Sequence, residues 1–526
     1  MTATGADVID LDDGNEVRGL NLDPSGAGGG IAGSTGDLSG IIDDVNILDT
    51  GTFGTQPGLE LDGTTGTFAI SNLTVSTNGA TGVRLNNAGT VTFAAAGNIS
   101  ITSANAAGLL ATGGGATGVN MGTSEFDAIT VTGSGTGGVS MTNTTGNTTF
   151  GDLALTTTSG ATPAFGLSSA GTVSVPGTGT QNVSATGGPA VDVTGTTVST
   201  LAFDAVSSTN NTTGDGINLA ALGAGTFTAT SGTITGAGGI AFDLEGGSGD
   251  VSYPGALNNG TGQTAEITGR SGGAVALSGA IADTNDAGGG ISLSGNTGGT
   301  TTFSNASKAI NSVGGTAVAM ASSDGHTLTL SGGGLDVDTT TGAGISASNS
   351  GTLVVSGAAN TIDSTSATAL HVTNTDIGAG GATFQRISSG NSTPSATDDP
   401  ANGIVLSNTG ASGGLTVSGN SSGICGGAVA VAATDGSGRP TGLNTVTAPS
   451  TADCTGGTIQ NSTGDGVSLM NTANASLTRM YIHHNRGNGI GGSSVNGFQL
   501  ANSLVELNGD SAADDDNGLD FTNLIG

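Results

Sequence analysis

The sequence predicts an all-β fold, a parallel β-helix (β-solenoid) of short stacked coils. The first observation is a recurring motif of a small residue, an aliphatic residue, any residue and a second aliphatic residue. The second is its spacing, because Val191 to Ile217 is 26 residues and Ile345 to Leu370 is 25. The third is composition, with 100 Gly among 526 residues, 9 % charged residues and no Trp. A period of this length without a 3.6-residue apolar stripe favours a β-solenoid over a helical repeat.

The recurring motif is expected to form the first strand of each coil. Its aliphatic residues alternate with polar ones, so they point inward and stack on the same position of the next coil, about 4.8 Å away. The copies lie at 82–85, 118–121, 138–141, 190–193, 216–219, 274–277, 290–293, 317–320, 344–347, 403–406 and 466–469.

Two further short strands follow the first in each period. Examples are residues 89–93 and then 98–101, or 326–330 and then 335–337. Gly, Asn and Asp between them suit the corners, because these residues adopt left-handed conformations at low cost. Three short strands per coil and roughly 18–20 coils give a rod on the order of 90 Å long.

The chain 1–526 is expected to be one domain, a fragment of a longer protein, since both ends fall inside the repeat. Leu370 to Ile404 takes 34 residues, and Val429 to Val467 takes 38. These intervals predict loop excursions near 371–403 and 430–466, where binding surfaces usually develop.

The charge of the chain restricts its partners. Forty acidic residues against 8 Lys and Arg give a formal net charge of −32. Such a surface repels phosphate backbones and anionic lipids, so we expect no nucleic-acid partner. No signal peptide is visible, and no apolar stretch is long enough for direct membrane insertion.

The two cysteines, Cys425 and Cys454, flank a stretch rich in Gly, Thr and Pro. We expect a disulfide that closes this loop, which suits an oxidising compartment. Two unrelated buried thiols are the alternative.

The pattern sharpens after residue 464, in a set of residues that comprises Gly466, Val467, Leu469, Ile482, Asn485, Gly489, Ile490 and Asn508. This segment resembles the repeat of the pectin-lyase-like superfamily, which implies a right-handed parallel β-helix. Asn485 and Asn508 match its turn asparagines, which can stack into a hydrogen-bonded ladder. The rest of the chain is similar to repeat regions of large bacterial secreted or surface proteins, including autotransporter passengers and filamentous-haemagglutinin-type adhesins.

The densest reactive cluster lies in the same segment and comprises Arg479, Tyr481, His483, His484 and Arg486, followed by Asp510, Asp514, Asp515 and Asp516. The resemblance implies a polysaccharide lyase or hydrolase site, with Arg479, His483, His484 and the three consecutive Asp residues as catalytic candidates. The competing interpretation places His483 and His484 at a corner, one outward and one inward, beside a solvated Asp loop. A carbohydrate cleft usually needs aromatic platforms, and 3 % aromatic residues supply few. We therefore assign no catalytic residue and no resident cofactor.

Calcium is the one ion that the sequence leaves open. Asp514, Asp516 and Asp520 are the candidate ligands, since Ca²⁺ takes carboxylate and carbonyl oxygens. Solvated loop acids are the alternative.

The leading expectation is a non-enzymatic, extracellular, structural or adhesive β-solenoid segment of a bacterial surface or secreted protein. Its partner would be a carbohydrate or a host or cell-surface ligand. Exposed terminal coils are also expected to associate end to end. A pectin-lyase-like polysaccharide lyase or hydrolase is the alternative function.

Overall fold

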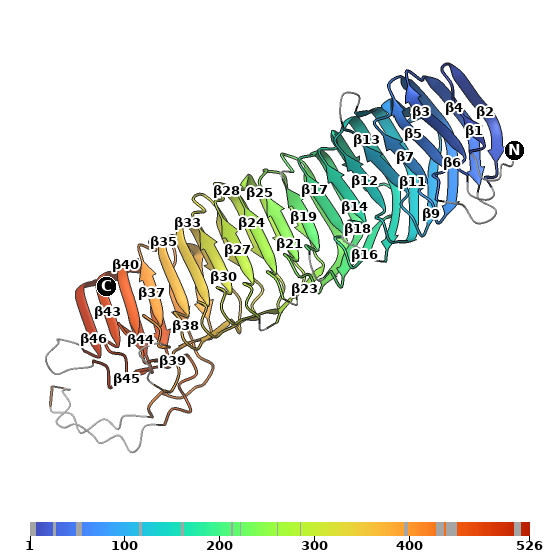
Figure 1. The fold of residues 1–526 in the computed structure, drawn as a ribbon. Coiled ribbons are helices and arrows are strands. Elements are labelled where there is room, and N and C mark those ends of the chain that lie inside the picture. The colour runs from blue at the N-terminus through green and yellow to red at the C-terminus, as the bar shows by residue number, and fades with distance from the viewer. Residues whose placement is uncertain are drawn as a thin grey trace. The chain divides into compact units, whose positions relative to one another are not determined.

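A computed structural model gives the fold as an all-β, parallel β-solenoid of about 18 turns, which confirms the predicted fold class. The structure describes residues 7–24, 28–48, 55–114, 118–158, 162–211, 214–220, 222–259, 261–284, 286–393, 398–427, 436–437, 450–509 and 517–526. These residues contain strands and no helix. The chain divides into two compact units, Met1–Gly279 (unit 1) and Ala280–Gly526 (unit 2). Figure 1 shows the strands of each unit lying side by side.

In unit 1 the first strands of successive coils pair in parallel. Val83 lies opposite Leu109, and Leu109 lies opposite Val139, so aliphatic side chains stack on one another. These strands are β1 (Ile9–Asp10), β3 (Ile31–Gly36), β5 (Leu59–Thr64), β7 (Val83–Asn86), β10 (Leu109–Thr112), β12 (Val139–Thr142), β14 (Phe165–Ser168), β17 (Val191–Thr194), β19 (Ile217–Ala220), β21 (Phe242–Glu245) and β24 (Ala265–Thr268).

The second and third strands of unit 1 are often continuous. Thus β11 pairs with both β8 and β9 of the preceding coil. The continuous strands are β2 (Asn15–Leu22), β4 (Gly40–Leu48), β6 (Thr67–Asn78), β11 (Val119–Ser134), β13 (Thr144–Thr157), β18 (Thr197–Thr209) and β20 (Thr226–Thr235). The separate ones are β8 (Gly89–Phe93), β9 (Ile99–Ala104), β15 (Thr172–Val175), β16 (Gln181–Thr186), β22 (Val251–Tyr253), β23 (Ala256–Asn259) and β25 (Ser271–Leu277).

In unit 2 the first and second strands are the ones that join. Thus β33 (Ile345–Val355) pairs with both β30 and β31, and β35 (Leu370–Phe384) pairs with both β37 and β38. The other first and second strands are β27 (Ile291–Ser294), β28 (Gly298–Phe303), β30 (Val318–Ala321), β31 (Thr327–Leu330), β37 (Ile404–Ser407), β38 (Leu415–Val417), β40 (Val467–Ala473), β41 (Ser476–Thr478), β43 (Ile490–Asn496), β44 (Gln499–Ala501) and β46 (Leu519–Ile525). The third strands are β26 (Ile281–Asp283), β29 (Lys308–Ser312), β32 (Leu335–Thr339), β34 (Thr361–Ser364), β36 (Arg386–Ser389), β39 (Gly457–Gln460), β42 (Met480–His483) and β45 (Leu504–Glu506).

Two copies of the recurring motif were placed wrongly as first strands. Val119 begins β11 and lies opposite Gly89, whereas Val275 lies opposite Val251, so both belong to second strands. The first strands of those coils are β10 and β24. The motif describes any strand that follows a small corner residue and has one buried face, so it cannot tell the three faces apart.

The long excursions leave unit 2 at two corners. One comprises residues 390–403, between β36 and β37, and the other comprises residues 418–456, between β38 and β39. The second makes the coil from Ile404 to Val467 63 residues long. Val429, which was expected to anchor a coil here, lies outside the described residues.

The cores of the two units differ in their large side chains. A chain of ring contacts runs through unit 1, with centroids 4.6–6.5 Å apart, and its members are Phe93, Phe126, Phe150, Phe165, Phe203, Phe227, Phe242 and Tyr253. The core of unit 2 is mainly aliphatic and contains the buried Phe303 and Phe384. Because protein interiors are close-packed, a change in the volume of these side chains should be felt by the neighbouring coils.

Candidate functional site

The polar cluster predicted from the sequence lies on the third strands at the end of unit 2. Gln460 of β39, His483 of β42 and Glu506 of β45 lie opposite one another on successive coils. Tyr481 precedes His483 by two residues, so both side chains leave the same face of β42. Parallel stacking therefore brings an aromatic ring, an imidazole and a carboxylate together.

Tyr481 is held by its neighbours in this cluster. Its hydroxyl donates a hydrogen bond to Glu506 Oε1 at 2.9 Å, and its ring stacks on His483 with centroids 3.8 Å apart. Burial, followed by the hydrogen bond and the charge of Glu506, raises the pKa of Tyr481. The phenol therefore stays protonated and acts as a hydrogen-bond donor.

The two histidines converge instead of pointing to opposite sides. Their Nδ1 atoms are 2.5 Å apart, and their rings meet edge to face with centroids 4.9 Å apart. Burial, and then the neighbouring His484, lower the pKa of His483 to about 4, although Glu506 opposes this shift. His483 is therefore neutral at pH 7.

Arg479 turns away from this cluster and binds the excursion. Its Nε donates to the carbonyl oxygen of Gly423 at 3.0 Å, and Nη1 donates to that of Ser418 at 3.1 Å. Arg486 lies 3.9 Å from a carboxylate oxygen of Asp399, which belongs to the other excursion. Both guanidinium groups therefore connect coils to excursions.

The predicted acidic candidates do not join the cluster as far as the structure describes them. Asp510, Asp514, Asp515 and Asp516 lie outside the described residues. Asp520 is exposed on β46, opposite Gly491. Within the described ranges, no three His, Cys, Asp or Glu side chains are placed to hold a metal ion.

Cys425 and Cys454 form a disulfide that closes the excursion of residues 418–456. The amide of Cys425 donates to the carbonyl oxygen of Asn502 at 3.0 Å, and the Cys425 sulfur lies 3.2 Å from the carbonyl oxygen of Met480. The excursion is thereby fixed beside the strands that carry the polar cluster.

Asn485 and Asn508 form the ladder that the resemblance implies. Asn485 Nδ2 donates to Asn508 Oδ1 at 2.8 Å, and the amide of Ser462 donates to Asn485 Oδ1 at 3.0 Å. Asn485 is buried, so these bonds satisfy an amide that would otherwise destabilise the corner.

Glu506 was missed by the sequence reasoning. The interval from Val467 to Ile490 is 23 residues, and the same step from His483 leads to residue 506. Coil length was therefore the signal that could have placed this carboxylate beside the histidine.

Buried cations were missed as well. The Arg270 guanidinium donates to the carbonyl oxygens of Gly246, Gly249 and Gly272. In unit 2 the Lys308 ammonium donates to those of Asn305, Ser331 and Gly333. Each cation thus satisfies the carbonyl groups of Gly-rich corners, which amino-acid composition alone does not reveal.

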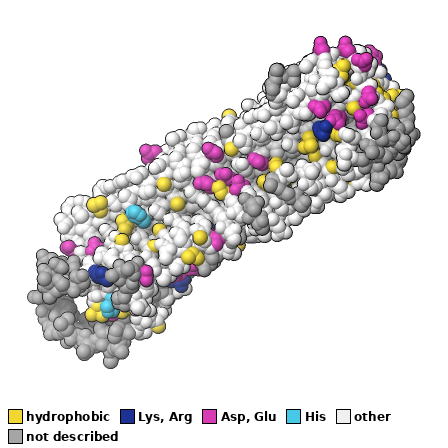
Figure 2. Space-filling view, viewed as in Figure 1, with side chains coloured by type: hydrophobic (Ala, Val, Ile, Leu, Met, Phe, Trp, Pro, Cys, Tyr) yellow, Lys and Arg dark blue, Asp and Glu magenta, His cyan; other side chains and the backbone are white. Residues whose placement is uncertain are grey.

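A polar row that contains three acids crosses the first strands of unit 1. Asp192, Asn218, Asp243 and Glu266 lie opposite one another on β17, β19, β21 and β24. Burial, and then the charges of Asp215, Glu266 and Glu245, raise the pKa of Asp243 to about 6. Figure 2 shows other acids scattered over a largely uncharged face.

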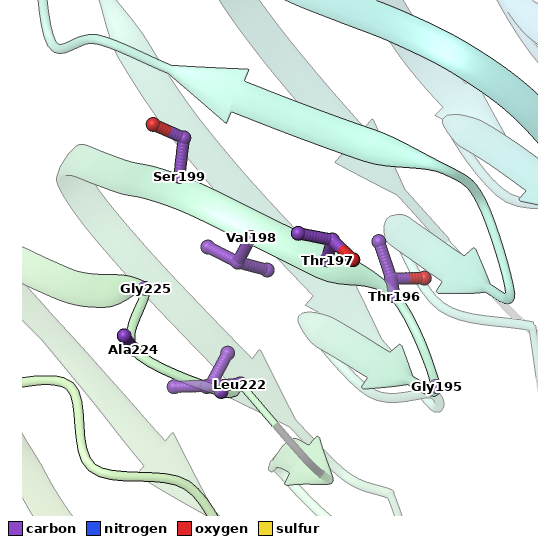
Figure 3. A pocket seen from close by; sticks show the side chains of 9 residues that line it. Gly195, Thr196, Thr197, Val198, Ser199, Leu222, Ala224 and Gly225 are labelled. Carbon is purple, nitrogen blue, oxygen red and sulfur yellow. The ribbon is translucent and has the colours of Figure 1, made fainter.

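A hollow in unit 1 lacks acid–base groups. Figure 3 shows that its lining comes from two chain segments, 195–199 and 222–225. Thr196, Thr197 and Ser199 contribute hydroxyl groups, while Val198 and Leu222 contribute apolar surface. These side chains can bind a polar ligand weakly, but none of them titrates near neutral pH.

No family model, curated protein or solved structure matches the chain. Among the described residues, no helix has the length and apolar character required to cross a membrane.

Proposed function

We propose that this chain is a non-enzymatic, structural and adhesive β-solenoid segment of a secreted or cell-surface bacterial protein. The supporting observation is the pattern of side chains that repeats from coil to coil in both units. Inward positions form buried aliphatic or aromatic rows, whereas outward positions are mostly Thr, Ser, Asn and Gly. The repeated side chains therefore maintain a stack and hydrate its surface, as a rigid spacer requires.

The proposed compartment is extracellular. The disulfide between Cys425 and Cys454 supports it, because such bonds persist mainly in oxidising environments. The proposed affiliation is with right-handed, pectin-lyase-like repeats of autotransporter-passenger or filamentous-haemagglutinin type. The corner ladder of Asn485 and Asn508 supports this affiliation.

The proposed partner is a carbohydrate or another host or cell-surface ligand, and nucleic acid is not expected at a net charge of −32. We also propose end-to-end association of this chain. Leu519 and Leu524 of β46 lie opposite the buried Ile490 and Val495 but are 49 % and 50 % exposed. A second copy stacked on β46 would cover them. The sedimentation coefficient of the wild type should therefore rise with protein concentration, and Leu524→Lys should reduce this rise.

A lyase or hydrolase is the second candidate, favoured by the proximity of Tyr481, His483 and Glu506. An imidazole with a pKa of about 4 is a weak base at neutral pH, however, and Arg479 is bonded to the excursion. Catalytic bases work best when their pKa lies near the operating pH. These properties support a structural role for the cluster.

The test exposes the full chain to a panel of acidic and neutral polysaccharides, with and without Ca²⁺. The proposal predicts retention on at least one immobilised glycan or cell-surface matrix, with no new reducing ends and no unsaturated uronate products. Product formation that disappears in His483→Gln would establish the enzyme instead. Absence of retention on every glycan and matrix would remove the adhesive part of the proposal.

A further inference from the structure

The backbone at the end of β42 brings two imidazoles to one side. Consecutive side chains of a strand normally point to opposite faces. His484 has a φ of 54°, in the left-handed region, and this turn rotates its side chain back toward His483. The resulting separation of 2.5 Å between the Nδ1 atoms is shorter than an ordinary N–H hydrogen bond.

Two nitrogen lone pairs at this distance repel each other unless an electropositive centre lies between them. A single shared proton satisfies the pair, and so does a metal ion bound to both nitrogens. Glu506, in register with His483 on β45, adds a negative charge nearby, and its Oε1 atom is fixed by Tyr481. This carboxylate offsets part of the cost that burial imposes on a positive charge beside His483.

We propose that His483 and His484 form a two-imidazole chelate for a divalent transition-metal ion, with Cu²⁺ preferred over Zn²⁺. Imidazole suits both metals, and Cu²⁺ binds such ligands more tightly. Water completes the coordination, and Glu506 balances the charge from outside. This binding is independent of the structural and adhesive function.

Bite geometry supports the preference for copper. Metal–imidazole bonds of about 2.0–2.1 Å place two nitrogens about 2.9 Å apart at a right angle and about 3.3 Å apart at a tetrahedral angle. The two Nδ1 atoms are 2.5 Å apart, so small ring rotations that separate them reach the distance required by a right angle before the longer distance required by a tetrahedral angle. Square-planar Cu²⁺ uses this angle, whereas Zn²⁺ prefers the tetrahedral one.

Hard cations do not suit this pair. Ca²⁺ and Mg²⁺ take six or more oxygen ligands, and two imidazoles supply none. In the described part of the chain, no third His, Cys, Asp or Glu completes a closed metal centre.

The experiment uses the full chain without a polyhistidine tag and titrates it with CuCl₂, ZnCl₂ and CaCl₂ in a weakly coordinating buffer. Calorimetry should give one Cu²⁺ per chain, with weaker Zn²⁺ binding at the same site. Electron paramagnetic resonance should show nitrogen couplings. His484→Gln should weaken Cu²⁺ binding by at least about tenfold.

His371→Gln is the matched control, because His371 is a half-buried histidine of unit 2 whose Nε2 lies 2.9 Å from Thr373 Oγ1. This control should leave Cu²⁺ affinity unchanged. Circular dichroism must show that the variants keep their β signal. Equal Cu²⁺ affinity in the wild type, His483→Gln and His484→Gln would overturn the proposal, as would no Cu²⁺ binding to the folded wild type or a Ca²⁺ affinity that exceeds the Cu²⁺ affinity and is lost in both variants.

Discussion

The two units build the same three-sided coil with different corners. In unit 1 the second strand runs on into the third, as in β6, β11 and β13. In unit 2 the first strand runs on into the second, as in β33 and β35. A coil can therefore keep its parallel register whichever corner the strand passes through without interruption.

The rows that stabilise the units differ as well. Unit 1 has a row of aromatic rings in its interior, in tilted, stacked and edge-to-face contact. Unit 2 has a ladder of asparagines at the corner between its first and second strands, namely Asn349, Asn374, Asn408 and Asn471. It also carries both long excursions and the histidine pair. The candidate binding groups of the chain thus lie where corners carry polar side chains and where loops leave the coil.

Phe150→Ala should have the largest effect and tests the aromatic row of unit 1. Phe150 is fully buried, and its ring centroid lies 5.5 Å from that of Phe126 and 5.7 Å from that of Phe165. Removing the ring should cost about 3–5 kcal/mol of stability because it leaves a cavity and breaks two ring contacts. Hydrogen exchange should show the loss of protection concentrated in unit 1.

Phe303→Ala gives the comparison in unit 2. Phe303 is equally buried, but among the described residues its ring contacts no other aromatic ring. Its loss should cost about 1 kcal/mol less than that of Phe150. Thr149→Ala, on the outward side, should change stability by less than about 0.5 kcal/mol. Equal costs for the two phenylalanines would show that ring contacts add nothing.

Removing the disulfide should affect unit 2 alone. Cys425 and Cys454 are separated by 29 residues. In the chain-entropy model, a loop of this length contributes about 3–4 kcal/mol to the ordering of the excursion. The double change to Ala should expose the amides of residue 425 and Gly426, which donate to the carbonyl oxygens of Asn502 and Ser450, to hydrogen exchange and leave unit 1 unchanged.

Arg479→Met in the disulfide-bonded protein separates the contribution of the Arg479 hydrogen bonds from that of the disulfide in holding the excursion of residues 418–456 against the coils. It removes the bonds to Gly423 and Ser418 while the covalent link remains. The loss of protection should be smaller than in the double variant. A larger loss would mean that the guanidinium, not the disulfide, holds the excursion.

Much of the fold followed from periodicity, because inward aliphatic residues recur once per coil. The placement of Val119 and Val275 on the wrong face shows its limit, since one motif serves three faces. The ring contacts, the carbonyl groups around Lys308 and the convergence of His483 with His484 depend on three-dimensional stacking and on single left-handed residues. A two-residue pattern contains no information on these.

Asp243→Asn tests the acids of unit 1 and their dependence on pH. The folded-state pKa of about 6 exceeds the ordinary 3.8, so the charged form destabilises the fold above about pH 6. The wild type should gain stability as the pH falls from 8 toward 4. At pH 8 the variant should be more stable than the wild type by on the order of 1 kcal/mol, because solvent screens this half-buried group.

Asp62→Asn changes the same charge on the same sheet, at β5, and is the control. Thermal melts at pH 4.5 and 8 should show the gain at pH 8 only for Asp243→Asn. An equal gain from Asp62→Asn would mean that net charge, and not the local acidic row, limits the stability of unit 1.

Asn408 variants should have the smallest effect and separate two roles of the corner asparagines in unit 2. Asn408 has a φ of 53°, donates to Asn374 Oδ1 at 2.7 Å and accepts from Asn471 Nδ2 at 2.9 Å. Asn408→Gly keeps the left-handed backbone and removes only the ladder, which should cost about 0.5–1 kcal/mol. Asn408→Ala also strains the backbone and should cost about 1 kcal/mol more. Urea unfolding followed by hydrogen exchange in unit 2 gives both values, and equal losses for Gly and Ala would assign the whole effect to the ladder.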